Sequence, residues 1–245
     1  MKKLIKKLKE IFLVAILTAG ITLLFLTLFS CSNSETSANK GSNEVYDRNY
    51  DVPLPNLALQ LLKEGNTRFV NNQVLLDNVS NEKRKTLKEK GQKPFAVILT
   101  CSDSRVPPEL IFDQGLGDLF VIRVAGNVLD SVVTGSIEYA VEHLKSSLVV
   151  VLGHEKCGAV TATVEGAEVP GSIPSICNRI KPIVDKVKIA NPEKKEIVDN
   201  VIDENVLENV TMLESDKLLK HLTESGSLKI VGGVYHLESG EVTFF

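Results

Sequence analysis

The chain of 245 residues has no tryptophan, two methionines and only four cysteines. No two of these cysteines form the Cys-x-x-Cys arrangement of a thiol redox protein, which argues against that class. Positive charge is not in excess either, because 28 basic residues stand against 31 acidic ones. The sequence therefore does not resemble a polycation that binds nucleic acid. It also contains no internal repeat.

The first thirty residues have the layout of a secretory signal, with five lysines before an uncharged run at 11–29. Residues 28–31, Leu-Phe-Ser-Cys, resemble the cleavage box of a bacterial lipoprotein, with Cys31 as the lipidated residue. Phe29 departs from the commonest form of that box, which has a small residue there. The alternative is an uncleaved anchor, because the run is close to the roughly 20 residues that span a bilayer. Both readings predict a membrane-attached protein whose folded part lies outside the cytoplasm.

The chain divides into three parts by composition. Residues 1–30 form the signal. Residues 31–56 contain few large apolar side chains, which predicts a flexible tether. Residues 57–245 have the size of one domain. Without residues 1–30, which hold five lysines and one glutamate, 23 basic and 30 acidic residues remain.

The pattern of the domain predicts an α/β fold with a central, mostly parallel sheet flanked by helices and an N-terminal helical arm. The runs at 95–100 and 148–152 are continuously apolar, as is typical of buried parallel strands. Further strands are expected at 118–123, 228–235 and 242–245. Helices are expected at 57–69, 81–90, 135–145, 176–189 and 193–225, with another that begins near residue 157.

Two short polar clusters follow the two apolar strands. Cys101, Asp103 and Arg105 follow the first, and His154 and Cys157 follow the second. Right-handed crossovers place the carboxyl ends of parallel strands at one edge of the sheet, where such sheets bind ligands. Two cysteines and a histidine suit zinc, and a catalytic zinc keeps one coordination position open. Either residue type alone would more often be structural, but the combination indicates a metalloenzyme. The remaining Cys177 is interpreted as a small buried hydrophobic residue.

Asp103 and Arg105 allow two interpretations. Asp103 could cap a turn while Arg105 is a solvated charge. The favoured interpretation is a paired dyad, in which the guanidinium keeps the carboxylate ionised and orients it. Beside a metal, such a carboxylate is either a fourth ligand or a proton acceptor for the metal-bound water.

Residues 101–107, Cys-Ser-Asp-Ser-Arg-Val-Pro, and 153–158, Gly-His-Glu-Lys-Cys-Gly, resemble the motifs of the β-class carbonic anhydrases. The resemblance covers residues 57–245, and four further fragments agree with it: 65–69, 120–127, 137–144 and 171–174. It implies one zinc ion per chain, bound by Cys101, His154 and Cys157. It further implies reversible hydration of carbon dioxide by a zinc-bound hydroxide that Asp103 and Arg105 orient, and a homodimer or a higher assembly of dimers.

The resemblance also implies a substrate pocket of the plant type. Its residues here are Gln92, Phe120, Ala125, Tyr139 and Gly158. The glutamine of that type reaches the substrate across the dimer interface, and Ala125 replaces a common valine, which would widen the pocket. Family members that bicarbonate inhibits carry a tryptophan near the dyad, and this chain has none. Arg123 matches an arginine of those members but occurs in both types, so no such regulatory site is expected.

Two alternatives keep the zinc but change the function. One is hydrolysis of carbon disulfide or carbonyl sulfide, the linear analogues of carbon dioxide. The other is a zinc-binding envelope protein without catalysis, which the presence of both dyad residues disfavours. Three further histidines, His143, His221 and His236, are interpreted as surface residues, although His143 is also a candidate proton shuttle.

Overall fold

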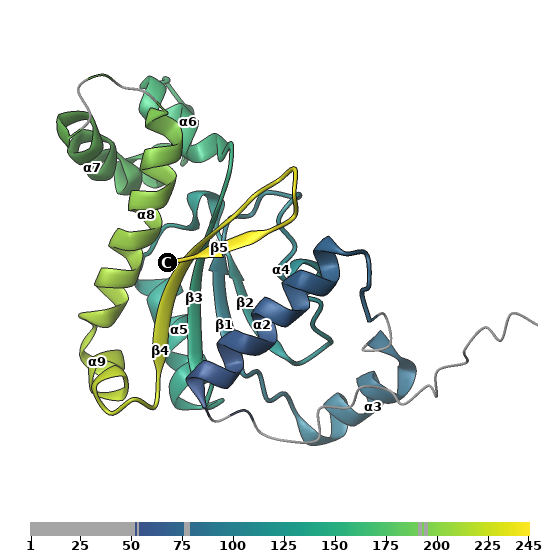
Figure 1. Cartoon of the computed structure of the whole chain (residues 1–245). Helices are drawn as coiled ribbons and strands as arrows, with labels where there is room; N and C mark the ends of the chain where they lie inside the picture. The colour runs from purple at the N-terminus through teal and green to yellow at the C-terminus, as the bar shows by residue number, and fades with distance from the viewer. Residues whose placement is uncertain (1–51, 53, 76–78, 191–192, 194–195) are drawn as a thin grey trace, which may run out of the picture. The chain divides into compact units, whose positions relative to one another are not determined.

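The computed structural model describes residues 52, 54–75, 79–190, 193 and 196–245. A five-stranded sheet lies at the centre, in the order β2-β1-β3-β4-β5 (Figure 1). The strands are β1 (Ala96–Thr100), β2 (Leu119–Arg123), β3 (Leu148–His154), β4 (Lys229–Tyr235) and β5 (Val242–Phe244). The first four are parallel and β5 is antiparallel to β4, so the expected mostly parallel sheet is confirmed.

The sheet forms because its central strands are apolar on both faces. Every residue of β1 and of β3 is buried. A strand that is covered on both sides has no face toward solvent, so polar residues do not alternate with apolar ones along it. This is why the two strands appear in the sequence as unbroken apolar runs. The two strands are direct neighbours, with Thr100 opposite Leu152. Their carboxyl ends therefore meet at one edge of the sheet. The strand order reverses at this point, because β2 lies on one side of β1 and β3 on the other.

Helices cover both faces of the sheet, and each face has its own apolar core. The helices are α2 (Pro55–Val70), α3 (Asn81–Lys90), α4 (Pro108–Ile111), α5 (Ser131–Glu142), α6 (Gly158–Glu165), α7 (Pro174–Ala190), α8 (Ile197–Glu214) and α9 (Lys217–Glu224), with a short 3-10 helix η2 (Ala125–Asn127). One core packs α2 and α4 against the sheet, through Leu62 and Phe112 among others. The other packs α5 to α9 against the opposite face, through Ile137, Ile180 and Val206 among others.

The structure contains two short helices that were not expected, α4 and η2, and three of the expected elements differ clearly from their predicted bounds. The helix expected at 193–225 is two helices, α8 and α9, because the Asp216 side chain accepts hydrogen bonds from the amides of Leu218 and Leu219 and starts a new helix. Helix α5 begins at 131, four residues early, because Asp130 caps it in the same way. Strand β3 continues to His154, which pairs with Tyr235 of β4.

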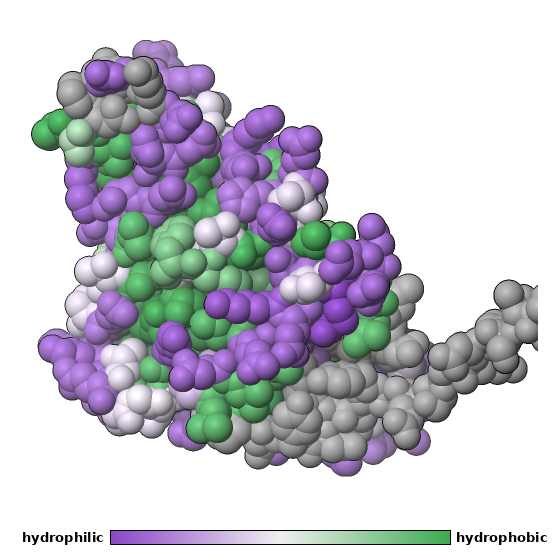
Figure 2. Space-filling model, in the orientation of Figure 1, coloured by the Kyte–Doolittle hydropathy of each residue, from purple (hydrophilic) through white to green (hydrophobic). Residues whose placement is uncertain are grey.

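The N-terminal signal, Cys31 and nearly all of the expected tether lie outside the described residues. Within the described part, no helix is long and apolar enough to cross a membrane. Figure 2 shows hydrophobic residues on the surface between α2 and α8. Phe245, which is 48% exposed, donates its amide to the carbonyl of Gly232 and lies against β4 there.

Candidate metal centre

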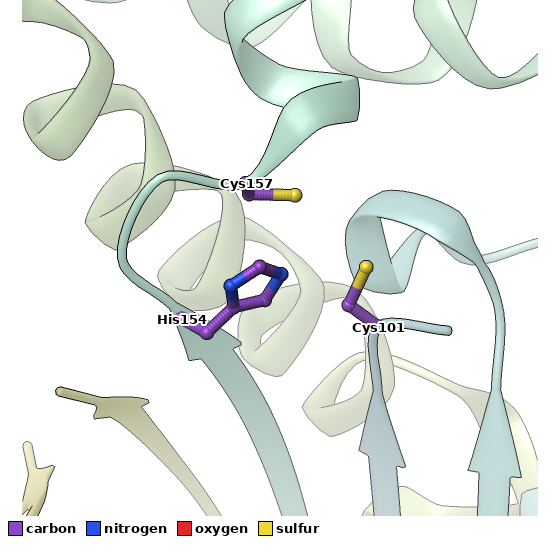
Figure 3. Close-up of side chains that lie close together, drawn as sticks. All are labelled: Cys101, His154 and Cys157. Carbon is purple, nitrogen blue, oxygen red and sulfur yellow. The ribbon is translucent and has the colours of Figure 1, made fainter. Parts of the chain in front are cut away.

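Cys101, His154 and Cys157 come together at the carboxyl edge of the sheet. Cys101 follows β1, His154 is the last residue of β3, and Cys157 is the N-cap of α6. All three are buried, and their ligand atoms lie within 4.8 Å of one another. Figure 3 shows the three side chains pointing toward a common point from these three elements. The expected strand topology had already predicted that these three residues lie at this edge.

The hydrogen bonding of His154 leaves one ring nitrogen for a metal. Its Nδ1 lies 2.8 Å from the carbonyl oxygen of Glu155. A carbonyl can only accept, so Nδ1 carries the proton and Nε2 has a free lone pair. Among the described residues, Nε2 is one of two buried side-chain polar atoms without a hydrogen-bond partner. A buried polar atom without a partner is costly, and a metal ion at this position would satisfy it.

The two cysteines are arranged as thiolate ligands. The hydrogen bond with Cys157 lowers the pKa of the Cys101 thiol, while the same contact and burial raise the pKa of Cys157. The amide of Gly126 also donates to Cys101 Sγ, at 3.4 Å. The two thiols thus lie in direct contact, so binding of a cation that prefers thiolates would release their protons.

Asp103 makes both of the interactions that the sequence left open. Its Oδ1 accepts hydrogen bonds from the Arg105 amide and from Arg105 Nε, each at 2.9 Å. Its Oδ2 accepts from Arg105 at 2.7 Å and lies 3.9 Å from His154 Nε2. The Arg105 guanidinium holds the pKa of the Asp103 carboxyl well below its usual range. An ionised carboxylate of fixed orientation thus stands beside the three ligand atoms.

Other groups hold the loop that carries Cys101 and Asp103. Arg123 donates through Nε to the Cys101 carbonyl at 3.2 Å and through its terminal nitrogen to the Asp103 carbonyl at 2.6 Å. In this chain Arg123 therefore supports the backbone of the site. Sequence reasoning considered it only for regulation, since which carbonyls an arginine reaches is decided by the fold.

The expected pocket residues are only partly assembled within one chain. Ala125 lies in η2 beside Gly126, and Gly158 directly follows Cys157, so both border the ligand cluster. Phe120 and Tyr139 form a tilted aromatic pair with ring centroids 6.3 Å apart, but Phe120 is opposite Val97, near the amino end of β1.

Gln92 is exposed and precedes β1. Eight residues separate it from Cys101, and the five of them that form β1 alone span about 16 Å at roughly 3.3 Å per residue. Within one chain, therefore, Gln92 lies at the opposite edge of the sheet from the cysteines.

Sequence reasoning missed a second hydrogen-bonded group beside the ligands. Glu155 contacts His236, with Oε1 2.9 Å from Nδ1, and the other ring nitrogen lies 2.9 Å from Thr243 Oγ1. This contact lowers the pKa of the Glu155 carboxyl. His236 does lie at the surface, with 36% of its side chain exposed, but both of its ring nitrogens are bound because β5 and the Glu155 loop fold back onto it. No local pattern around residue 236 signals these contacts.

The comparisons with known proteins agree on one family. A family model described as carbonic anhydrase matches residues 96–242. The carbonic anhydrase of Mycolicibacterium smegmatis is 44% identical over 194 residues, which cover 77% of this chain and 92% of the relative. Carbonic anhydrase 2 of Mycobacterium tuberculosis is 43% identical over 191 residues, covering 76% and 90%.

Solved structures give the same result. The β-carbonic anhydrase CafA of Aspergillus fumigatus superposes with a TM-score of 0.61 at 28% identity, over 78% of this chain and 89% of that one. One of two tetrameric β-carbonic anhydrases of Sordaria macrospora superposes with a TM-score of 0.60 at 25% identity, over 67% and 87%.

Proposed function

Because this chain belongs to the carbonic anhydrase family, and to its β class, we propose that it catalyses the reversible hydration of carbon dioxide to bicarbonate and a proton. One zinc ion per chain is the cofactor, and Cys101, His154 and Cys157 would hold it. The observation that carries the proposal is the buried, unpartnered Nε2 of His154 beside two cysteine sulfurs. Two sulfurs and one imidazole leave the fourth position of a tetrahedral zinc free.

The bound metal supplies one chemical function. Zinc lowers the pKa of a coordinated water from 15.7 toward about 7, and two thiolates, which neutralise its charge, should make this effect weaker than three imidazoles do. We therefore expect the hydration rate to rise from pH 6 to pH 9. Stopped-flow rates across that range provide the test, and a flat profile would contradict this account of the donor set.

The role proposed for Asp103 follows from its contacts. Both oxygens are held by Arg105, and an ionised carboxylate can accept a hydrogen bond but cannot donate one. Beside the ligands it would accept a hydrogen bond from the attacking oxygen and turn that oxygen's lone pair toward carbon dioxide. Orientation of this kind contributes to rate because reacting atoms must already be aligned.

The decisive experiment measures hydration and zinc together. Stopped-flow carbon dioxide hydration would be recorded on the full chain in detergent, with zinc content determined on the same sample. Fast hydration with one zinc per chain, lost in Asp103→Ala while the zinc stays, is the expected result. Zinc without hydration would favour a sulfur-containing analogue of carbon dioxide or a non-catalytic zinc protein, and both substrates can be tested directly.

The position of Gln92 supports a site shared between two copies of the chain. Gln92 cannot reach the cysteines of its own chain across β1, so a second copy would bring its Gln92 to this site. Exposed hydrophobic side chains, including Val132 at 75% and Tyr139 at 48% exposure, are consistent with such an interface. A homodimer, or an assembly of dimers, is the corresponding state.

A mixing experiment tests the shared site. Gln92→Ala and Asp103→Ala chains are each expected to be weakly active. In a fully exchanged dimer mixture at equal amounts, about a quarter of the sites would combine an intact Asp103 with an intact Gln92 from the partner. Activity should therefore recover on mixing. No recovery, with subunit exchange shown by differently tagged chains, would place Gln92 at its own chain's site or outside it.

We also propose export and lipidation at Cys31. The support is the sequence layout alone: five lysines, an uncharged run at 11–29 and the Leu-Phe-Ser-Cys box. A bacterial host fed radiolabelled palmitate should label the wild-type chain but not Cys31→Ser. Labelling of neither chain, with both in the membrane fraction, would support the uncleaved anchor.

A further inference from the structure

In the sequence, Glu155 lies between two proposed zinc ligands, His154 and Cys157. Both of its carboxylate oxygens and its backbone amide have hydrogen-bond partners. Its Oε1 lies 2.9 Å from His236 Nδ1, and its Oε2 accepts the Leu237 amide at 2.9 Å. Its own amide donates to the carbonyl of Tyr235 at 3.2 Å. Glu155, the residue next to His154, is thus hydrogen-bonded to the end of β4 and to the turn that leads to β5.

We propose that Glu155 is a positioning residue of the zinc centre, and that His236 holds it in place. The inference rests on zinc binding by Cys101, His154 and Cys157. The carboxylate acts through the backbone of its own residue, because the Glu155 carbonyl accepts the Nδ1 proton of His154 at 2.8 Å. Fixing the side chain fixes this carbonyl, and the carbonyl sets the ring orientation and tautomer of the ligand.

The neighbouring backbone explains why such an anchor is needed. Lys156 adopts a left-handed conformation, with φ of 52°, in the loop between His154 and Cys157. Residues other than glycine adopt this region only when surrounding contacts hold them there. Arg105 contacts the Lys156 carbonyl at a long 3.5 Å. The firm contacts on the other side of the loop are those of the Glu155 carboxylate.

Strand β5 completes the anchor. Thr243 Oγ1 lies 2.9 Å from His236 Nε2, so both ring nitrogens are bound. Because an ionised carboxylate only accepts, Nδ1 of His236 carries the proton that points to Glu155. The antiparallel strand at the edge of the sheet thereby contributes to the orientation of a ligand on β3, with β4 between them.

Metal release tests the inference without relying on hydration. In full-length protein, His236→Ala and Glu155→Ala should lose about 10- to 100-fold in zinc affinity, the usual cost of losing a partner that orients a ligand, and should release zinc to a chromogenic chelator correspondingly faster. The cobalt(II)-substituted variants should show shifted visible and sulfur-to-metal charge-transfer bands. His236→Asn should approach wild-type behaviour, because its side-chain amide can replace the Nδ1 donor.

Two controls separate positioning from general stability. His221→Ala removes an exposed histidine of α9 and should change neither release nor spectrum. The double variant Glu155→Ala/His236→Ala should release zinc no faster than Glu155→Ala alone, because both changes break one link. If a variant unfolds, His236→Asn and Glu155→Gln still provide the comparison.

The outcomes distinguish the two proposals. Unchanged zinc release and cobalt spectra in His236→Ala and Glu155→Ala would overturn the positioning role even if hydration is fast. Altered release and spectra in a wild-type background that does not hydrate carbon dioxide would support positioning while the proposed activity fails. A wild-type chain that binds no zinc would overturn both.

Discussion

Gly126 is a single residue on which the metal centre depends. Its φ is 69°, a conformation that favours glycine, and its amide donates to Cys101 Sγ. A Cβ at this position would lie 2.8 Å from Ile180 and 3.2 Å from Ala159. The residue therefore combines a backbone requirement, a packing requirement and a contact with a proposed ligand.

We expect Gly126→Ala to destabilise the fold and to weaken zinc binding. Gly166→Ala is the matched control, because Gly166 has the same φ of 69° but nothing within 4 Å of its Cβ position. The control should lose about 1–2 kcal/mol from the left-handed conformation alone. Gly126→Ala should lose more and should release zinc faster, as measured by urea unfolding and chelator competition. Equal losses and equal release rates would remove the special role of Gly126.

Helix α8 supports the metal centre at the scale of whole elements. Asn205 donates to the Gly126 carbonyl at 3.0 Å, and Asn209, one turn later, donates to the Asn127 carbonyl at 3.1 Å. Both asparagines are buried. Helix α8 thus fixes η2, which in turn donates the Gly126 amide to Cys101. Burial of these two side-chain amides is tolerated because each donates a hydrogen bond to a backbone carbonyl of η2.

Asn205→Asp should show the energetic weight of this support. The variant keeps the shape of the side chain but removes the donor and faces the Gly126 carbonyl with an acceptor. A loss on the order of 1–3 kcal/mol in the free energy of unfolding is expected. Asn178→Asp, at an exposed position of α7, should change little. Similar small effects for both variants would contradict the coupling of α8 to η2.

Asp203 on the same helix provides a prediction about pH. Desolvation first and the nearby Asp199 second raise the pKa of its carboxyl. A carboxyl with a raised folded-state pKa favours the fold below its unfolded pKa, near 3.9, and this contribution is lost as pH rises through the folded value.

Asp203→Asn should therefore raise the melting temperature near pH 7 and have no such effect near pH 3. The gain should be at most about 2 °C, since surface substitutions usually change stability by less than about 0.5 kcal/mol. Melting curves of both proteins at the two pH values provide the test. A larger gain in melting temperature at pH 3 than at pH 7 would contradict a raised pKa of Asp203 in the folded state.

At the scale of the whole molecule, the metal should stabilise the fold that builds its site. The three ligands come from β1, β3 and the start of α6, which meet only in the folded chain. A ligand that binds only the folded state stabilises it by about 4 kcal/mol at 1,000 times its Kd. Zinc binding should therefore raise the free energy of unfolding of the whole domain.

Removing zinc with a chelator should lower the melting temperature, by roughly 8–16 °C if zinc was present at that excess. Cys157→Ala should abolish the difference between chelated and zinc-loaded samples, because it removes one of three ligands. Cys177→Ala, which leaves the ligand cluster intact, should preserve it. An unchanged melting temperature after verified zinc removal would argue against a folding role for the metal.

The buried strands could be predicted closely because their cause is local. Residues 95–99 and 148–152 are apolar throughout, and β1 and β3 lie there, although β1 also includes Thr100 and β3 extends two residues further. That extension depends on Tyr235 of β4 as a pairing partner for His154. The break between α8 and α9 was missed because the apolar spacing continues across Asp216, while the capping hydrogen bonds decide the boundary.

By itself, the amino-acid sequence determined the two ligand clusters, the parallel strands before them and the dyad, since Asp103 and Arg105 are two residues apart and pair within one turn. Only the tertiary structure decided what lies around them. Gln92 was separated from the cysteines by the length of β1, and Arg123, Asn205 and His236 were brought to the loops of the site from distant segments. Local spacing sets which side chains share a turn, but contacts across 20 to 80 residues depend on how the strands and helices pack.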